Sequence, residues 1–374
     1  MNISRRKAML AAGTSVGLSR FGSLNSWSSP GTGHSACSIT PVGFDQVWIW
    51  EDEPEDQEGT VDSREFDVTV GVRWKSGGTV RNLMSSTVAP IQFPEQQIVS
   101  VEVKHPAGAE ARLVALSESC GQLQVTAPVM ERGQEIEAKA VYRMKLSRFC
   151  PHYSADQFPA KQEVSADIRQ MYLGNSPGIR SDLNAVKQVV DQVRSRHEHP
   201  WQTANKFHGW VWENIDGKPG AYTSVREALS SRVGDCEERA GVFIALCRAA
   251  GIPARLVWVP NHSWAEFCLF DEAGKPHWIP AHTAAYNWFG WTGAHELVLQ
   301  KGDRIRMPGK DSVVRLVMDW YSFEGRRPTI EFFGSMTPVA SQGKDPGPGK
   351  RKKNEHGGWD LVCEHPAKGR IRGA

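Results

Sequence analysis

Apolar and polar residues alternate along much of the chain between residues 44 and 150. The clearest run places apolar side chains at every second position: Phe66, Val68, Val70, Val72 and Trp74. Successive side chains of a β-strand point to opposite faces of a sheet, so this run predicts a strand with one buried side and one solvent-facing side. The alternation returns over residues 136–146, and shorter stretches around Val101 and Val125 lie between the long runs. We therefore predict an antiparallel, β-sandwich-like domain over residues 44–150.

The apolar period becomes that of a helix after residue 182. One stripe contains Leu183, Val186, Val189, Val190 and Val193. Ser181 or Asp182 is the expected N-cap of this helix, because short polar side chains bind the free N–H groups of a first turn. Pro200 is expected to open a second helix, since proline suits the first helical position. We place a mixed helix and strand domain at residues 160–335.

A third helix is expected to begin at Cys236. Asp235 can cap it, and Glu238 follows three residues later in the capping-box position. Gly251 is expected to mark its end. The free N–H groups and positive dipole end of the first turn favour a thiolate over a thiol, and the same N–H groups could hold an oxyanion. Cys236 is therefore a candidate nucleophile.

A nucleophilic thiol needs a base, and His262 is the candidate. Residues 254–259 and 263–270 have the pattern of two strands joined by a short turn at Pro260 and Asn261. This places His262 where the second strand begins. A histidine at a loop edge is commonly a polar residue without a catalytic role. The assignment of His262 as the base therefore depends on the sequence around it.

Four short segments stand out around and after Cys236. They are Gly234-Asp235-Cys236-Glu237-Glu238, Arg248-Ala249-Ala250-Gly251-Ile252-Pro253-Ala254-Arg255, His262-Ser263-Trp264-Ala265-Glu266 and Trp278-Ile279-Pro280. In this order and at these separations they resemble the transglutaminase-like superfamily. The resemblance implies an α+β fold with a papain-like transglutaminase core, in which the cysteine helix packs on an antiparallel sheet that carries the histidine. It also implies a Cys-His-Asp triad whose first two members are Cys236 and His262.

The third triad position departs from the family pattern. The family's aspartate follows Trp-x-Pro-x, and this chain has His282 there. A neutral His282 could accept a hydrogen bond and orient His262, but it supplies no negative charge. Asp271 is close in sequence, yet we expect it in a hairpin turn that points away from the site. The candidate catalytic residues are therefore Cys236, His262 and His282.

Two other interpretations stay open on the sequence alone. Cys236, His262 and His282 are residue types that bind metals, although they lack the close paired spacing of a structural zinc site. The chain could also be a degenerate binding module that keeps the fold without the chemistry. As an enzyme, it would attack an amide carbonyl, form a thioester at the cysteine and pass the acyl group to water or an amine. Peptide or amide hydrolysis is the favoured outcome, with amine transfer second.

Composition narrows the range of partners. The chain has 374 residues, of which 40% are hydrophobic, and a formal net charge of +2. Because the charges are nearly balanced, the chain has no strong net positive potential that would attract nucleic acid. Apart from the N-terminal region, no apolar run is long enough to span a membrane. We expect a protein or peptide substrate, no cofactor and no metal, while the sequence sets no oligomeric state.

Both ends of the chain have the composition of segments outside a packed core. Ser4-Arg5-Arg6-Lys7 precedes a short apolar stretch and resembles a twin-arginine export signal. We therefore expect residues 1–36 to be an export signal and linker, and the protein to be periplasmic or secreted. Residues 338–374 are rich in Gly, Pro and Lys and are expected to form a disordered basic tail.

The cysteine count is compatible with export. An oxidising compartment permits disulfides, and Cys120 and Cys150 could form one within the β-rich region. The chain has seven cysteines, and an odd number leaves at least one thiol free unless it pairs between chains. We expect that free thiol to be Cys236.

Overall fold

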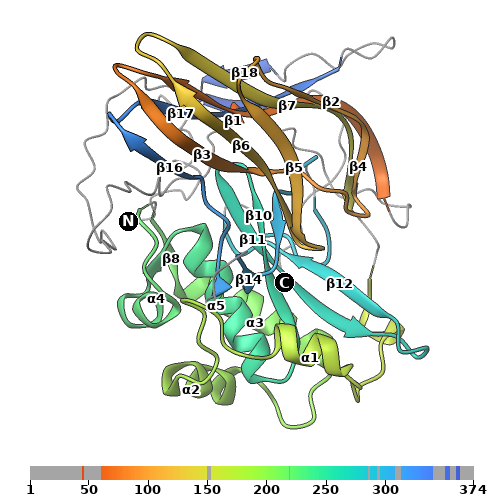
Figure 1. Ribbon diagram of the computed structural model, residues 1–374. Coiled ribbons are helices and arrows are strands. Elements are labelled where there is room, and N and C mark those ends of the chain that lie inside the picture. Colours follow the sequence, from red (N-terminus) through yellow and green to blue (C-terminus); the bar gives the residue numbers. More distant parts are fainter. Residues whose placement is uncertain are drawn as a thin grey trace. The chain divides into compact units, whose positions relative to one another are not determined.

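The computed structural model describes most residues between 60 and 339 and a short hairpin near the C-terminus (Figure 1). The described residues are 44–45, 60–149, 153–218, 220–284, 287–292, 295–307, 313–339, 350–353 and 359–362. The predicted export signal lies outside them. The chain divides into two compact units, Met1–Asn25 with Ala340–Ala374, and Ser26–Val339.

Two β-sheets form much of the unit Ser26–Val339 (Figure 1). The first has the order β1 (Phe44–Asp45), β17 (Thr329–Pro338), β2 (Thr60–Lys75), β7 (Glu135–Phe149) and β4 (Gln96–Lys104). The second has the order β12 (Pro276–Ala281), β11 (His262–Phe270), β10 (Ala254–Val259), β13 (Gln300–Lys301), β6 (Cys120–Met130), β3 (Val80–Ala89) and β16 (Trp320–Gly325). Strand β5 (Glu110–Ser117) also pairs with β6.

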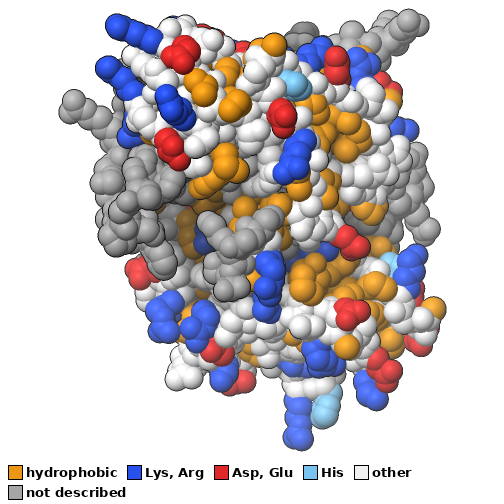
Figure 2. All heavy atoms as spheres, viewed as in Figure 1, with side chains coloured by type: hydrophobic (Ala, Val, Ile, Leu, Met, Phe, Trp, Pro, Cys, Tyr) orange, Lys and Arg blue, Asp and Glu red, His pale blue; other side chains and the backbone are white. Residues whose placement is uncertain are grey.

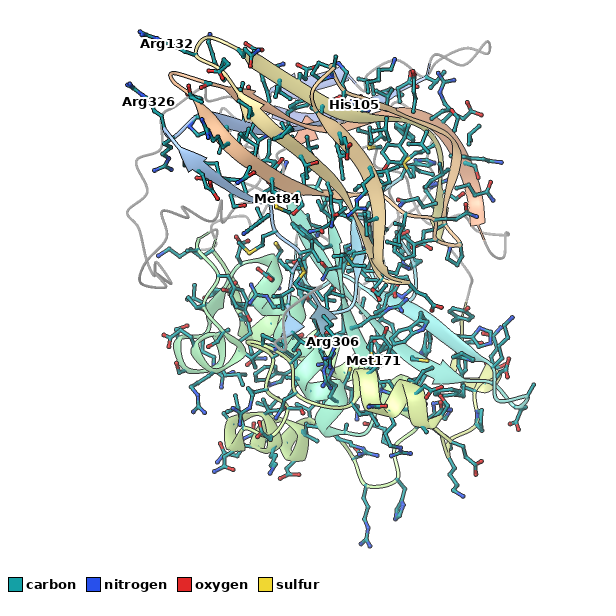
Figure 3. The ribbon with its side chains drawn as sticks, in the orientation of Figure 1. Met84, His105, Arg132, Met171, Arg306 and Arg326 are labelled. Atoms are coloured by element: carbon teal, nitrogen blue, oxygen red, sulfur yellow. The ribbon has the colours of Figure 1, made fainter. Side chains whose placement is uncertain are left out.

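The long alternating runs form buried strands, as predicted. The five apolar side chains of β2, namely Phe66, Val68, Val70, Val72 and Trp74, are each at most 2% exposed. The shorter run on β4 differs, because Val99 and Val101 are 56% and 42% exposed. In the described part of its sheet β4 pairs only with β7, so it lies at an edge. Met84 of β3, labelled in Figure 3, is also exposed. Alternation therefore identifies these strands without telling which of their faces are covered.

Strand β13 joins the N-terminal strands to the strand pair that begins with His262. Gln300 lies opposite Cys120 of β6 on one side and opposite Trp258 of β10 on the other. Strands β16 and β17 come late in the sequence, yet they pair with β3 and β2. The division at 44–150 and 160–335 stays a prediction, and β16 and β17 pair with strands of the N-terminal region.

A fragment of residues 44–150 should aggregate when expressed alone, although its alternation by itself suggests an independent domain. β17 pairs with β2 along Thr329–Pro338, and its removal would expose a long strand edge together with part of the core. Unpaired edges of this kind associate with other chains. Size-exclusion chromatography of the fragment beside the intact chain tests this expectation. A monodisperse fragment with a cooperative melting transition would contradict it.

Within the described residues, five α-helices lie beside the β10, β11 and β12 end of the second sheet (Figure 1). They are α1 (Ala166–Tyr172), α2 (Asn184–Val193), α3 (Pro200–Asn214), α4 (Val225–Ser231) and α5 (Cys236–Ala249). Helix α5 packs in a common core with Ala265 and Phe267 of β11 and with apolar residues of α2, α3 and α4. This core fixes α5 against the strand that carries His262.

The predicted helix boundaries are mostly confirmed. Pro200 is the first residue of α3, and α5 ends just before Gly251, which has a φ of 84°. The predicted cap of α2 is wrong, because Leu183 is the N-cap and no side chain caps it. Asp182 instead forms an ion pair with Arg180 at 2.6 Å. The competing charge on the neighbouring arginine therefore takes the carboxylate away from the helix.

The basic segment near the C-terminus contains a strand where the sequence predicted disorder. β18 (Lys350–Lys353) pairs antiparallel with β19 (Trp359–Val362), while most of the remaining tail lies outside the described residues.

On the face drawn in Figure 2, Lys and Arg side chains are interspersed with Asp and Glu. Of the helices that the structure describes, none is long and apolar enough to cross a membrane.

Candidate active site

Cys236 is the first residue of α5, and the capping box predicted for this helix is present. The Asp235 carboxylate accepts a hydrogen bond from the backbone N–H of Cys236 at 2.7 Å. Glu238 accepts one from the N–H of Asp235 at 2.9 Å and another from the N–H of Thr223 at 2.5 Å. Because Glu238 is buried, these bonds hold the first turn, and with it the thiol, in a fixed position.

The cap also changes the chemistry expected at the helix N-terminus. The Cys236 N–H is already bonded to Asp235, so it is not directed at a substrate oxygen. Burial, together with the nearby Asp235 charge, raises the pKa of the Cys236 thiol to about 12. Burial therefore opposes the thiolate that the helix N-terminus is expected to favour. A helix dipole contributes only about 0.3–1 kcal/mol, and burial outweighs it here.

Ser263, which the sequence did not single out, contacts the thiol. Its hydroxyl donates to Cys236 Sγ at 3.7 Å, and this contact opposes the effect of burial on the cysteine pKa. Ser263 directly follows His262, so the start of β11 lies beside the N-terminus of α5. Only the position of Ser263 next to His262 could have marked it in the sequence.

His262 is the first residue of β11, as predicted. Asn261 has a φ of 58° in the tight turn between β10 and β11, a conformation that asparagine tolerates better than most residues. The His262 side chain is buried, and burial lowers its pKa to about 4. The imidazole is therefore neutral near pH 7 and able to accept a proton.

His282 lies beside His262 on one face of the sheet. Ala281 is opposite Ala265, so the next residue, His282, continues the register toward Trp264. The His282 ring stacks on the Trp264 ring with centroids 4.6 Å apart, and its centroid is 6.1 Å from that of His262. Burial holds the His282 pKa well below its ordinary value. The structure thus places His282 beside His262 and places Ser263, the residue after His262, in contact with Cys236.

The backbone of His282 is held by a second buried histidine. His208 of α3 donates from Nε2 to the His282 carbonyl at 2.7 Å, and the His282 N–H donates to the Trp288 carbonyl at 2.8 Å. Burial lowers the pKa of His208 to about 4, so it too is neutral. His208 lies within a helix, and no local pattern predicts this contact.

Asp271 lies at the far end of β11, as predicted. Its N–H donates to the Lys275 carbonyl in the turn before β12, and its carboxylate contacts His277 at 2.8 Å. A strand rises about 3.3 Å per residue, so Asp271 is roughly 25–30 Å from the end of β11 that begins with His262. It cannot orient that imidazole.

Glu296 is the carboxylate close to His282. Its Oε2 is 3.8 Å from His282 Nε2, and both side chains are at most 3% exposed. Burial raises the pKa of Glu296 to about 8. Glu296 precedes β13 and has neither the spacing nor the periodicity of a motif residue, so no sequence pattern points to it.

The N-terminal region packs behind the candidate site. Phe93 shares a small core with Trp264 and with Val298, which precedes β13. Close by, Lys301 forms buried ion pairs with Glu95 at 2.6 Å and with Glu266 of β11 at 2.7 Å. These contacts cover the face of the sheet that carries Trp264 and His282, so the β-rich region supports the site.

A charged and aromatic cluster lies next to the thiol. Arg315 donates to the carboxylate of Glu237 at 2.5 Å, and its guanidinium is 3.4 Å from the centre of the Tyr222 ring. Glu237 directly follows Cys236. The segment that contains Arg315 is therefore tied to the first turn of α5.

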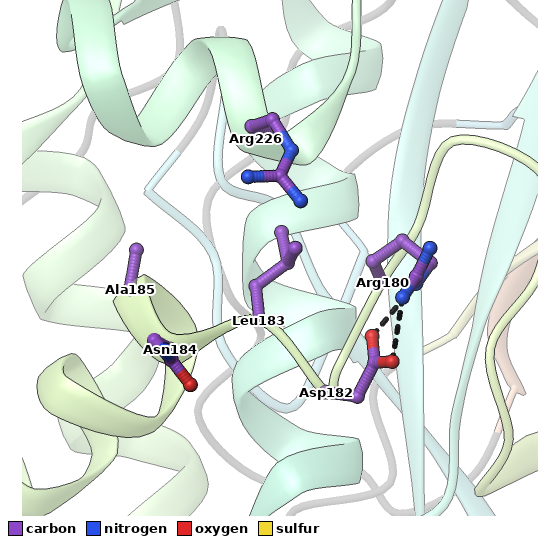
Figure 4. Close-up of a pocket in the computed structure, with 6 residues that line it drawn as sticks. All are labelled: Arg180, Asp182, Leu183, Asn184, Ala185 and Arg226. Carbon is purple, nitrogen blue, oxygen red and sulfur yellow. Dashed lines mark hydrogen bonds and ion pairs between the residues drawn. The ribbon is translucent and has the colours of Figure 1, made fainter.

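Other candidate features do not contribute to this site. A surface pocket beside the starts of α2 and α4 is lined by Arg180, Asp182, Leu183, Asn184, Ala185 and Arg226 (Figure 4). None of the three candidate catalytic residues lines it. Within the part of the chain that the structure describes, no group of three His, Cys, Asp or Glu side chains could hold a metal ion. The metal interpretation of Cys236, His262 and His282 therefore gains no support.

Cys120, which the sequence left as a possible disulfide partner, is buried with a free thiol. Its possible partner Cys150 lies outside the described residues. Burial raises the pKa of Cys120 to about 12. Cys236 is also free, as expected.

Comparison with known proteins agrees with this geometry. Residues 187–283 match the Transglutaminase-like superfamily, and this range includes Cys236, His262 and His282. An uncharacterised protein of Haemophilus influenzae is 31% identical over 106 residues, which are 27% of this chain and 28% of that relative. A crystal structure from Cytophaga hutchinsonii, described as a "putative cysteine protease", matches with a TM-score of 0.51 at 15% identity, over 76% of this chain and 94% of that chain. The predicted α+β fold with a transglutaminase-like core is confirmed.

Proposed function

We propose that this chain is an exported cysteine enzyme that acts on amide bonds of proteins or peptides through a thioester at Cys236. The observation that carries the proposal is the position of the thiol, at the start of α5 and in contact with Ser263, the residue after His262. The transglutaminase-like core supports the assignment of a cysteine nucleophile. Export rests on the arginine pair at Arg5 and Arg6 and the apolar stretch that follows.

The reaction would follow general-base chemistry. His262 takes the thiol proton as Cys236 sulfur bonds to the amide carbon, and this proton passes to the departing amine as the C–N bond breaks. Water or a primary amine then attacks the thioester and gives its proton to His262, from which the released sulfur regains it. Pairing a thiol of pKa about 12 with an imidazole of pKa about 4 favours this route over a preformed ion pair. Hydrolysis is the favoured outcome, with amine transfer second.

A degenerate binding module is the second candidate. Two observations favour it: the Cys236 N–H is bonded to Asp235, and His282 replaces the acidic residue of the triad. In that case Cys236 would be an ordinary thiol with no assistance from a base.

The pH dependence of Cys236 alkylation separates the two candidates. With His262 as base, the rate with iodoacetamide should rise by far less than about tenfold per pH unit between about pH 5 and 7, because burial keeps the His262 pKa near 4 and the ring stays neutral. An unassisted thiol of pKa about 12 should instead react about tenfold faster per pH unit throughout the neutral range.

The adduct must be mapped by mass spectrometry, because the chain has seven cysteines. Cys247 and Cys268 are internal controls, since burial raises both thiol pKa values and neither lies at a helix N-terminus. They should remain unmodified while Cys236 reacts. A slope of about tenfold per pH unit at Cys236 would exclude base assistance and leave the binding module.

A further inference from the structure

The ring of His282 is fixed between two possible partners. Stacking on Trp264, with an angle of 18° between the rings, sets its plane, and the bond from His208 to its carbonyl sets its backbone. The Nε2 edge faces Glu296 at 3.8 Å. The His262 ring is the neighbouring imidazole, at 6.1 Å between centroids. His282 therefore lies between a buried carboxylate and the proposed base.

Glu296 has no lysine or arginine as an ion-pair partner among the described residues, although its side chain is almost completely buried. Trp264 of β11 contacts it and lowers its pKa, whereas burial and the carboxylate of Glu95 raise it. Glu95 itself is paired with Lys301 at 2.6 Å, and Lys301 also binds Glu266. The neighbouring His295 is buried as well. Of these groups, His282 has a ring nitrogen within ion-pair distance of Glu296, at 3.8 Å.

We propose that Glu296 is a positioning residue that selects the tautomer of His282 and, through it, orients His262. The proposal rests on the proposed function. A neutral imidazole has one N–H and one lone pair, and the bond made by one nitrogen fixes the role of the other. An ionised Glu296 accepts from Nε2–H of His282 and so leaves the Nδ1 lone pair to accept from His262. The second nitrogen of His262 is then free to take the thiol proton.

A protonated Glu296 has the opposite effect. It donates to Nε2 of His282, so the ring proton moves to Nδ1 and faces His262 as a donor. His282 then no longer accepts from His262 and so does not orient it for proton transfer from Cys236. In the family pattern one aspartate accepts directly from the histidine, whereas here a histidine and a buried glutamate would divide that role between them.

The change of His282 tautomer should appear as a step in the pH dependence of the Cys236 alkylation rate. Because burial raises the Glu296 pKa to about 8, the productive tautomer is lost below that pH and gained above it. The groups that face the pair are neutral His262 and His208, the Lys301-paired Glu95, and Trp264. In the intact protein we expect the iodoacetamide rate at Cys236 to rise by about tenfold across this pH, on an otherwise shallow profile.

Glu296→Gln should remove the step, since an amide does not ionise. Its matched control is Glu95→Gln, which makes the same change at the neighbouring carboxylate that contacts Lys301 instead of His282. The Glu95 charge raises the Glu296 pKa, so its removal should keep the step and move it to lower pH. Melting temperatures of both variants establish whether they are folded.

Each outcome has a defined meaning. A step that persists in folded Glu296→Gln, or complete loss of labelling at every pH, would overturn the tautomer assignment. If Glu296→Gln does not fold, the Glu95→Gln profile decides, because an absent or unmoved step would equally overturn it. A wild-type rate that rises about tenfold per pH unit throughout would instead refute the proposed function itself.

Discussion

Cys236→Ser should abolish amide hydrolysis and amine transfer while the protein stays folded. Serine is similar in size and suits the start of a helix, and Asp235 and Glu238 would keep the capping box. Its hydroxyl is a far weaker acid than a thiol, and burial already makes His262 a weak base with a pKa of about 4. Loss of a catalytic nucleophile typically lowers turnover by orders of magnitude, so we expect a decrease of at least about 10³-fold.

The experiment needs a control that removes a different thiol from the same helix. Cys247→Ala removes the thiol of a fully buried residue of α5. Cys247 packs in the core and takes no part in the proposed reaction. It should lower the melting temperature and keep turnover. Activity can be followed as peptide release from casein and as incorporation of a fluorescent primary amine into casein. Retained turnover in folded Cys236→Ser would exclude a covalent cysteine mechanism.

Local patterns predicted the parts of the fold that depend on neighbouring residues. The alternation along β2, the proline at the start of α3 and the capping box around Cys236 each involve groups within a few residues of one another. The tight turn before His262 is of the same kind, because it depends on Asn261 tolerating a positive φ. For these elements, short-range geometry and burial favour the same structure.

Features that depend on distant pairing could not be predicted in this way. Nothing within β17 specifies that it pairs with β2 instead of strands nearer in sequence. The exposure of Val101 follows from the edge position of β4, which is a property of the whole sheet. The raised pKa of Cys236 likewise depends on burial by residues from several elements, whereas its helix position was visible in the sequence.

The candidate site shows the same division. His282 attracted attention because it breaks a family pattern at a defined spacing, and the structure places it beside His262. His208 and Glu296 have no such spacing, since the fold alone brings an interior helix residue and a residue before β13 to the same ring. The sequence shows that the third triad position lacks an acid. Only the folded structure shows that the Glu296 carboxylate lies near His282, the residue at that position.

Asp303→Ala should destabilise the protein strongly. Arg248, in the last turn of α5, and Asp303, after β13, form an ion pair at 2.7 Å in which both side chains are fully buried. Removing the carboxylate leaves the guanidinium buried and without its counter-charge, although its bonds to the Ala254 and Gly174 carbonyls remain. Loss of one partner of such a pair typically costs about 3–5 kcal/mol, a large part of the stability of most domains.

A matched exposed pair isolates the effect of burial. Arg180 and Asp182 are also an arginine and an aspartate, joined at 2.6 Å, but both side chains are about half exposed. Water can solvate Arg180 after Asp182→Ala, so this variant should unfold at nearly the same urea concentration as the wild type. The buried variant should unfold at a much lower one. Equal urea midpoints for the two variants would contradict this prediction. They would show that losing the counter-charge of buried Arg248 does not lower the stability, so the Arg248–Asp303 pair does not hold α5 to the segment after β13.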